Sequence, residues 1–307
     1  PKLLNFVHQL IESRGLLFAL TGSSARRLKQ KGTNLLAGRA WNRNLHPLSI
    51  FETQIATESE LISRLEWGGL PKAYGLATDS DRTDYLRAYA QNYVKQEIQS
   101  EQWVRRLDPF RKFLPIAAQM NGKILNYSSI SREVGVDSNT IQTYYQILED
   151  TLMGFELPGY DRSVRKQQRK ASKFYLFDTG VKRALDRTLD VKLKPSTSAF
   201  GEAFEHFVFL ELKTLHDIRS KDYKWSYLRT KDGLEIDLIL ERPGLPTALI
   251  KIKSATEVRA EHASSLNELT DSFPEAEYYL LSRDPLPRTF GKVQAVHFQD
   301  GIEKIIG

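Results

Sequence analysis

The stretch LEIDLILERPGLPTALIKIKS, residues 234–254, places two short apolar runs on either side of a turn rich in proline and glycine. Short apolar runs between such turns are typical of strands inside a sheet. Asp237 lies within the first run, where a carboxylate is costly to bury unless it has a partner. Lys251 and Lys253 share one face of the second run, because strand side chains alternate with a period of two. The stretch therefore predicts two adjacent strands that carry a charged site.

The segments around these strands extend them into an α/β domain over residues 195–307. A linker of Pro, Ser and Thr at 191–199 precedes an amphipathic helix, FGEAFEHFVFLELKTL, which carries Glu205. Further strands are predicted at 224–230, 277–282 and 293–298. Glu205 on the helix, Asp237 and Lys253 form the skeleton of a metal-dependent phosphodiesterase. In such a site, carboxylates hold a hard cation and a lysine stabilises the developing charge.

Residues 109–190 predict a winged helix-turn-helix. A helix is expected at 109–122, and a second at 128–135 with Ser128 or Ser129 as its cap. After a turn of about three residues at Gly135, a third helix is expected from a cap at Asp137 or Ser138 to 154. A hairpin follows, and its basic wing consists of Arg162, Arg165, Lys166, Arg169, Lys170 and Lys173. This density of cations fits contacts with the phosphates of double-stranded DNA. The second helix offers Asn139, Thr140, Gln142 and Thr143 to base edges, although such residues are equally ordinary on a helix surface. Internal packing as a regulatory unit is the alternative.

The first hundred residues predict a fragment of an α/β sheet over 1–55 and a helical unit over 56–108. A helix at 3–14 precedes LLFAL, residues 16–20, an unbroken apolar run that predicts a buried parallel strand. A second strand is expected to end at Pro47. Residues 57–107 then follow a helical period.

Composition excludes several classes of function. The 307 residues contain no cysteine, which removes disulfides, thiolate zinc sites and cysteine nucleophiles. No apolar run approaches the roughly 18 residues of a membrane span, and the first residues do not resemble a signal peptide, so we expect a cytoplasmic protein with no membrane partner. Residues 1–50 hold eight Lys or Arg and one acid, whereas 200–307 hold 14 basic and 18 acidic residues, which favours separate modules. The histidines show no metal-ligand spacing: they are His8, His46, His206, His216, His262 and His297.

Taken together, the motifs resemble prokaryotic AAA-like ATPases of the archaeal type, whose C-terminal domain of unknown function is similar to restriction-endonuclease-like folds. The matching segments, in the family's order, are ALTGSSARRLKQKGTNLLAGRA (19–40), HPLS (46–49), WGGLP (67–71), KFYLFDTG (173–180) and FGEAFEHFVFLEL (200–212). The resemblance implies a partial AAA-like α/β remnant at 1–55, a helical lid at 56–108, the winged helix at 109–190 and a restriction-endonuclease-like domain at 195–307.

The resemblance also implies nucleotide-binding roles. Ser23 or Ser24 would read the γ-phosphate, and Arg39 would be an arginine finger that reaches the nucleotide of a neighbouring copy, which would require a homo-oligomer. The phosphate loop G-x-x-x-x-G-K-[ST] is absent from the sequence. We therefore expect the chain to be the C-terminal part, or a degenerate member, of such an ATPase, with ATP and Mg²⁺ bound only if a preceding half supplies that loop.

Active versions of the restriction-endonuclease-like fold place an acid two residues before the strand lysine. Lys251 occupies that position here, and its ammonium would repel a divalent cation or pair with Asp237. Glu235, which shares a strand face with Asp237, is a better substitute ligand than Glu241. We expect a weak nuclease or none. A regulatory or nucleic-acid-binding function is the first hypothesis, and a metal-dependent nuclease or a non-catalytic partner-binding module are the alternatives.

Overall fold

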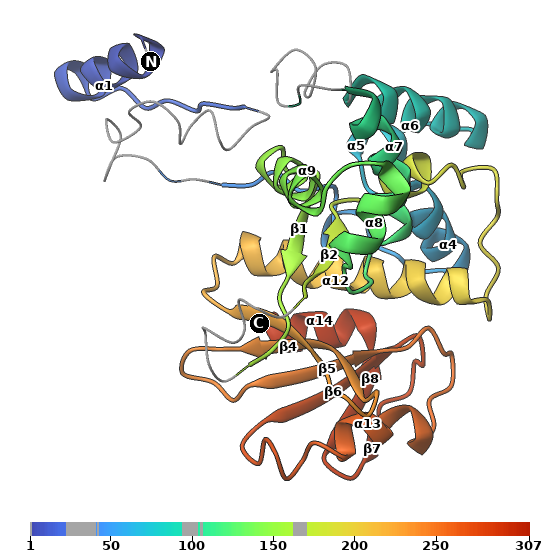
Figure 1. Ribbon diagram of the computed structural model, residues 1–307. Coiled ribbons are helices and arrows are strands. Elements are labelled where there is room, and N and C mark those ends of the chain that lie inside the picture. Colours follow the sequence, from blue (N-terminus) through green and yellow to red (C-terminus); the bar gives the residue numbers. More distant parts are fainter. Residues whose placement is uncertain (1, 23–40, 42, 94–103, 105–106, 162–170) are drawn as a thin grey trace.

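The computed structural model describes residues 2–22, 41, 43–93, 104, 107–161 and 171–307, and shows a mixed α/β protein with two sheets (Figure 1). Its helices are α1 (Lys2–Arg14), α3 (Ile50–Thr53), α4 (Glu58–Trp67), α5 (Pro71–Tyr74), α6 (Asp79–Tyr93), α7 (Leu107–Gln119), α8 (Tyr127–Val134), α9 (Ser138–Asp150), α11 (Thr179–Leu185), α12 (Ser198–Ile218), α13 (Ser264–Asn267) and α14 (Phe298–Ile306). Its strands are β1 (Gly154–Leu157), β2 (Lys173–Leu176), β3 (Lys224–Arg229), β4 (Glu235–Glu241), β5 (Ala248–Ile252), β6 (Glu277–Ser282), β7 (Arg288–Phe290) and β8 (Val293–His297).

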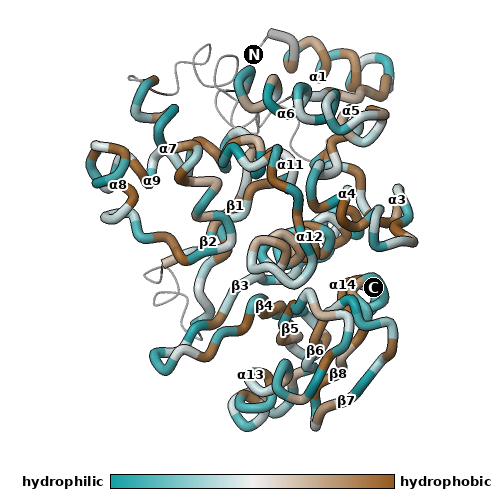
Figure 2. The backbone as a smooth tube through the Cα atoms, turned by 90° about the vertical axis from the view of Figure 1, so that its right-hand side faces the viewer, coloured by the Kyte–Doolittle hydropathy of each residue, from teal (hydrophilic) through white to brown (hydrophobic). Residues whose placement is uncertain are grey.

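The larger sheet has six strands in the order β3-β4-β5-β6-β8-β7. Strands β3, β4 and β5 pair antiparallel, β5, β6 and β8 pair parallel, and β7 pairs antiparallel with β8 at the edge. Helices α12 and α14 cover one face, where Phe204 and Phe298 pack, and the segment containing α13 covers the other (Figure 1). Both faces are buried, which is why β4, β5 and β6 are so apolar; Figure 2 shows these strands beneath α12.

A second core holds α6 to α9 and α11 against the short sheet. Strands β1 and β2 pair antiparallel, with Gly154 opposite Leu176. The rings of Phe113 and Tyr145 meet edge to face with centroids 4.9 Å apart, and the rings of Tyr145 and Phe174 are at the same distance. The three helices α7, α8 and α9 thus stack on a two-stranded sheet, in the element order that the sequence predicts for 109–190.

The N-terminal segment corrects one prediction. Residues 15–22 form no strand, and the side chain of Leu17 is 97% exposed. An apolar run is buried as a strand only when neighbouring strands receive it, and no described strand lies beside this one. The second strand predicted to end at Pro47 is also missing from the part that the structure describes, 43–47. The described residues of 1–55 therefore contain helices α1 and α3 but no sheet.

Among the residues with a described position, no helix is long and apolar enough to cross a membrane.

Candidate functional site

The charged residues predicted from the strand pair meet at a bulge in β4. Strand β3 pairs Ser226 with Ile239 but Leu228 with Ile236, so β4 contains one extra residue at this point. The pairing of β4 with β5 ends at Leu238, opposite Ile250. Beyond that pair, the Asp237 carboxylate accepts a hydrogen bond from the backbone N–H of Ile252 at 2.7 Å. A side chain thus replaces the main-chain acceptor that a regular ladder would supply.

Both strand carboxylates at this bulge are paired with lysines. Lys251 Nζ lies 2.7 Å from Asp237 Oδ1, which is the pairing that the sequence left open as an alternative. Lys173 Nζ, which comes from β2 in the other sheet, lies 2.6 Å from Glu235 Oε1. Asp237 is only 3% exposed and Lys173 only 2%. We call Glu205, Asp237, Glu235, Lys251 and Lys173 the ion-pair cluster.

Glu205 on α12 completes this cluster without a lysine of its own. Its Oε1 accepts a hydrogen bond of 3.4 Å from the hydroxyl of Tyr175 on β2. Burial, together with the negative charge of Asp237, raises the pKa of Glu205 to about 7, although Lys173 and Lys251 act in the opposite direction. Burial and the charge of Glu205 in turn raise the pKa of Tyr175 well above its ordinary value. Glu205 is therefore largely protonated below neutral pH.

Glu235 behaves differently because it holds a cation. Burial opposes ionisation of Glu235, but the hydrogen bond and charge of Lys173 outweigh it, and the pKa of Glu235 lies below its usual range.

Glu241, the other substitute ligand considered from the sequence, lies at the far end of β4, and its carboxylate is 3.7 Å from Lys224 Nζ. Lys253 follows the end of β5; its backbone N–H donates to Leu281 O, and its side chain pairs with no described acid. In the described part of the chain, no three His, Asp or Glu residues are arranged to hold a metal ion.

Most of the predicted DNA and nucleotide contacts lie outside the described residues, namely Arg162, Arg165, Lys166, Arg169, Lys170, Ser23, Ser24 and Arg39. Of the predicted basic wing, Lys173 is the residue that the structure describes, and it lies in β2 instead of an exposed wing. All four residues of β2 are buried, and the Lys173 ammonium pairs with Glu235 instead of facing solvent.

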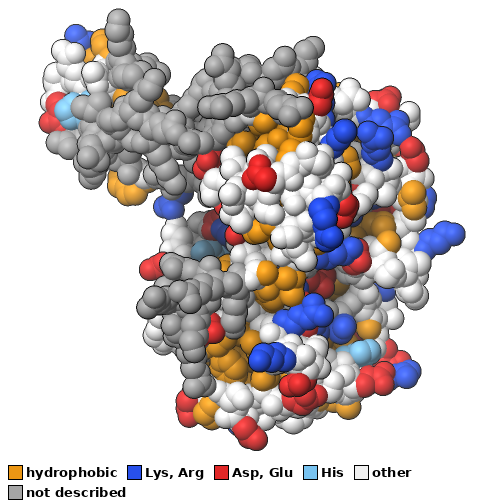
Figure 3. All heavy atoms as spheres, in the orientation of Figure 1, with side chains coloured by type: hydrophobic (Ala, Val, Ile, Leu, Met, Phe, Trp, Pro, Cys, Tyr) orange, Lys and Arg blue, Asp and Glu red, His pale blue; other side chains and the backbone are white. Residues whose placement is uncertain are grey.

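Helix α9 contributes little positive charge to a nucleic-acid surface. It contains no Lys or Arg. The backbone N–H and the hydroxyl of Thr140 both bond to Asp137, which caps the helix, and the Thr143 hydroxyl donates to Asn139 O. Asn139 and Gln142 remain exposed. On the face shown in Figure 3, Lys and Arg side chains form small groups interspersed with Asp and Glu.

Sequence reasoning missed a buried junction built by the motifs WGGLP and KFYLFDTG. Arg64 on α4 donates to Glu211 Oε1 on α12 at 3.2 Å, and Glu211 Oε2 accepts from the backbone N–H of Ile50 at 3.0 Å. Asp178 accepts from the backbone N–H of Gly69 at 2.7 Å and caps α11 through the N–H of Val181 at 2.9 Å. The available signal was the presence of small residues in both motifs, Gly68 and Gly69 in the first and Gly180 near Asp178 in the second.

The junction leaves no room for side chains at its glycines. A Cβ on Gly68, whose φ is +73°, would lie 2.1 Å from Asp178 Oδ1. A Cβ on Gly180 would lie 2.3 Å from Trp67 O. The two motifs therefore hold α4 and α11 in close backbone contact, and the Arg64–Glu211 pair links α4 to α12 of the C-terminal domain.

Two family models match the chain, and both junction motifs lie within the first. Residues 58–193 match the family described as domain of unknown function DUF8612, and residues 200–298 match domain of unknown function DUF4143. The second match contains the whole ion-pair cluster except Lys173, which lies in the first.

Curated relatives are similarly uncharacterized. Proteins of Mycobacterium tuberculosis (strain ATCC 25618 / H37Rv) and Mycobacterium bovis are each 25% identical over 257 residues, which is 82% of this chain and 56% of theirs. A protein of Haemophilus influenzae is 23% identical over 207 residues, 63% of this chain and 50% of its own length. No solved structure matches the chain significantly. The chain thus spans about half the length of the curated relatives it matches.

Proposed function

We propose that this chain is a non-catalytic, regulatory part of an AAA-like ATPase, in which a restriction-endonuclease-like domain has become a partner-binding module. The observation that carries the proposal is the pairing of both strand carboxylates with lysines, Asp237 with Lys251 and Glu235 with Lys173. A mixed sheet whose strand β4 carries Glu235 and Asp237 supports the assignment of the fold. The greater length of the curated relatives is compatible with a further domain in such proteins.

The pairing works against metal-assisted phosphodiester hydrolysis. Two unit charges about 4 Å apart interact by roughly 4 kcal/mol at the effective dielectric of a protein surface, and a divalent cation doubles that repulsion from Lys251. Glu205 offers little compensation, because its raised pKa leaves it only partly ionised near neutral pH. Lys173 reaches the cluster from β2, so the part of the chain before the C-terminal domain also covers the site.

The buried junction supports a regulatory role. Arg64 on α4 connects the helical unit to Glu211 on α12 of the C-terminal domain through a buried hydrogen bond, and Asp178 at the start of α11 holds the same helical unit through the backbone N–H of Gly69. Buried polar networks have one satisfied arrangement, so a rotation of the helical unit would be transmitted to the C-terminal domain.

Cleavage of supercoiled plasmid tests whether the domain is a nuclease. We expect no cleavage above background by the wild type in Mg²⁺ or in Mn²⁺. Asp237→Ala serves as the site variant, and Asp232→Ala, which alters an exposed acid in the preceding turn, is the matched control. Cleavage by the wild type and by Asp232→Ala that is lost in Asp237→Ala would overturn the proposal.

A second candidate function, DNA binding, rests on the order α7, α8, α9, β1, β2, which supports a winged helix. The wing residues between β1 and β2 would supply the phosphate contacts, since α9 has no cation. We expect any duplex binding to fall steeply with salt and to disappear when Arg165, Lys166, Arg169 and Lys170 are replaced by Glu. Gel-shift retention unchanged by these four replacements would contradict this function and favour internal packing.

A further inference from the structure

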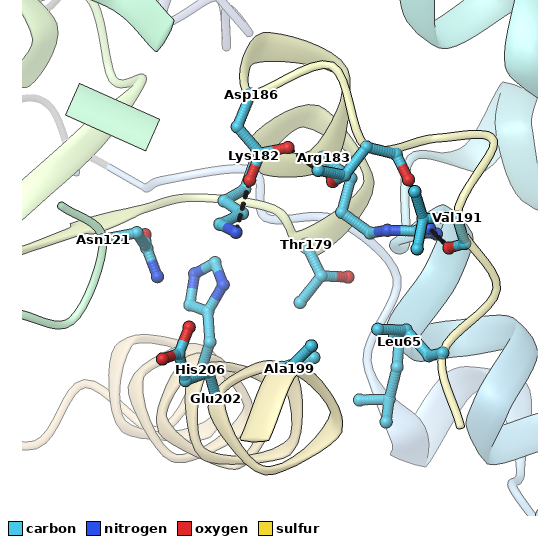
Figure 4. A pocket seen from close by; sticks show the side chains of 13 residues that line it. Leu65, Asn121, Thr179, Lys182, Arg183, Asp186, Val191, Ala199, Glu202 and His206 are labelled. Carbon is cyan, nitrogen blue, oxygen red and sulfur yellow. Dashed lines mark hydrogen bonds and ion pairs between the residues drawn. The ribbon is translucent and has the colours of Figure 1, made fainter. Parts of the chain in front are cut away.

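A cavity of about 120 Å³ lies between α11 and the first half of α12, away from the ion-pair cluster (Figure 4). At roughly 10–15 Å³ per water-sized probe, it has room for several water molecules or one small ligand. Asn121, Lys182 and His206, from the α7–α8 turn and from these two helices, point into the same space (Figure 4). Its polar wall is therefore assembled from three separate elements.

Two of these side chains keep unused donors, one oriented by a backbone N–H and the other by a carboxylate. Asn121 Oδ1 accepts a hydrogen bond from the backbone N–H of Leu176 at 2.7 Å, so the amide group Nδ2 carries two N–H donors on the other side. Lys182 Nζ donates to Asp186 at 2.5 Å and retains two further N–H groups. Asp186 is also an acceptor for the Thr188 hydroxyl, so this acid is already engaged.

The third side chain supplies an acceptor. His206 Nε2 lies 2.7 Å from Leu176 O, which can only accept, so Nε2 carries the proton and Nδ1 a lone pair. His206 is 3% exposed, and Nδ1 has no hydrogen-bond partner among the described residues. Burial lowers the pKa of His206 to about 4, which keeps the ring neutral at physiological pH.

The cavity wall also contains a cation without a carboxylate partner. Arg183 is 4% exposed, and its guanidinium donates to the carbonyl oxygens of Glu66, Thr188 and Val191. None of the described acids lies within ion-pair distance of it. Glu66, Asp186 and Asp190 act on its charge from beyond that distance, and the carboxylates of Asp186 and Glu202 also line the cavity, so an anion has to be held by the donors that face it directly.

We propose that this cavity binds a small oxyanion that also carries a hydroxyl group, for which inorganic phosphate and a 2-hydroxycarboxylate are the two candidate sources. The anionic oxygens accept from Asn121 Nδ2 and Lys182 Nζ, and the hydroxyl donates to His206 Nδ1. An anion without a hydroxyl offers no donor to Nδ1, and sites built around such an acceptor reject analogues that lack its partner. The cavity is lined by Thr179 on α11, whose hydroxyl donates to Arg64 O on α4, and by residues of α12, so a ligand there lies between α11 and the C-terminal domain.

Calorimetric titration of the 307-residue chain at neutral pH and constant ionic strength tests this with two matched pairs of anions. Phosphate is compared with sulfate, and glycolate with acetate, because only the first of each pair has a hydroxyl at this pH. We expect either phosphate or glycolate to bind at least about tenfold more tightly than its partner, and the pair that shows this identifies the source. Equal affinities within both pairs, or no binding of either hydroxyl-bearing anion, would overturn the proposal.

A variant separates this site from nonspecific anion binding. Asn121→Asp keeps the acceptor for the Leu176 N–H but replaces the facing donor by a carboxylate oxygen, and we expect it to weaken binding at least about tenfold. Lys194→Gln, an exposed lysine outside the cavity, is the control and should bind as the wild type does. If Asn121→Asp does not fold by circular dichroism, Lys182→Gln replaces it with the same expectation. Unchanged affinity in a folded site variant would contradict the proposal.

Discussion

Glu205 and Glu211 lie six residues apart on α12 and meet two different environments. Burial raises the pKa of each to about 7. The Glu211 carboxylate faces the positive charge of Arg64, whereas Glu205 faces a tyrosine hydroxyl and the like charge of Asp237. Replacing each by its neutral isostere should therefore have opposite effects.

We predict that Glu205→Gln stabilises the protein at about pH 8 and flattens its pH dependence. The pKa of Glu205 is higher in the folded chain than the 4.5 of an unperturbed glutamate, so its contribution to stability is complete below that value and is lost as the pH rises through about 7. Glutamine has no proton to lose. Urea unfolding of wild type and variant between about pH 5 and pH 8 measures this difference; parallel curves would refute it.

Glu211→Gln should instead destabilise the protein at about pH 8, where Glu211, whose pKa burial raises to about 7, is ionised and paired with Arg64. The change leaves the Arg64 guanidinium, 8% exposed, without its carboxylate. Breaking a buried pair by removing one partner costs about 3–5 kcal/mol. The same urea titration reports it, and a loss below about 1 kcal/mol would show that the backbone carbonyls already satisfy Arg64.

At the scale of elements, local signals were predictable and long-range partners were not. Helices are present at 3–14, 128–135 and 200–215, because the helical period and the capping residues depend only on residues close in sequence. Asp137 caps α9 as predicted. Helix α8 begins one residue before Ser128 and is capped by Asn126 instead of Ser128 or Ser129. The strand predicted at 16–20 does not form, because its burial would require neighbouring strands from other parts of the sequence.

The candidate site divides in the same way. Asp237 and Lys251 lie on adjacent strands joined by one turn, so the strand period was enough to anticipate their pairing. The contact of Lys173 with Glu235 joins residues 62 positions apart in two different sheets, and nothing in either local pattern points to it. The junction of Asp178 with Gly69 spans 109 positions and was equally hidden.

The junction between α4 and α11 gives a prediction at this scale. Gly68→Ala should cost at least about 3 kcal/mol, because it combines a left-handed φ with an overlap between the new Cβ and Asp178. Gly135→Ala is the control: its φ is +80°, but nothing lies within 4 Å of the new Cβ, so only about 1 kcal/mol is expected. Thermal unfolding of both variants measures the difference, and equal losses would show that the overlap is relieved.

At the scale of the whole molecule, the chain presents a body of two joined units and an N-terminal arm. Helix α1 stands apart from the body in Figure 1, and the extended residues after it expose Leu16, Leu17 and Phe18. Under the proposed regulatory function, these 307 residues do not themselves hold a nucleotide.

We therefore predict that the 307-residue chain by itself binds ATP more weakly than about 10 µM, which corresponds to roughly −7 kcal/mol. The sequence lacks the glycine-rich loop whose backbone N–H groups and lysine hold the β- and γ-phosphates. Titration calorimetry with Mg²⁺ and ATP checks this, and tighter binding would require a phosphate site of a different kind.

In the function proposed for this chain, lysines occupy the positions where a nuclease would hold its cation. Mn²⁺ binding, followed by the electron paramagnetic resonance signal of the free ion, tests it most directly. The account predicts no site in the wild type tighter than about 1 mM, since Lys251 and Lys173 already neutralise Asp237 and Glu235. One equivalent of Mn²⁺ bound at about 10 µM by the wild type, and lost in Asp237→Ala but not in Asp232→Ala, would contradict it.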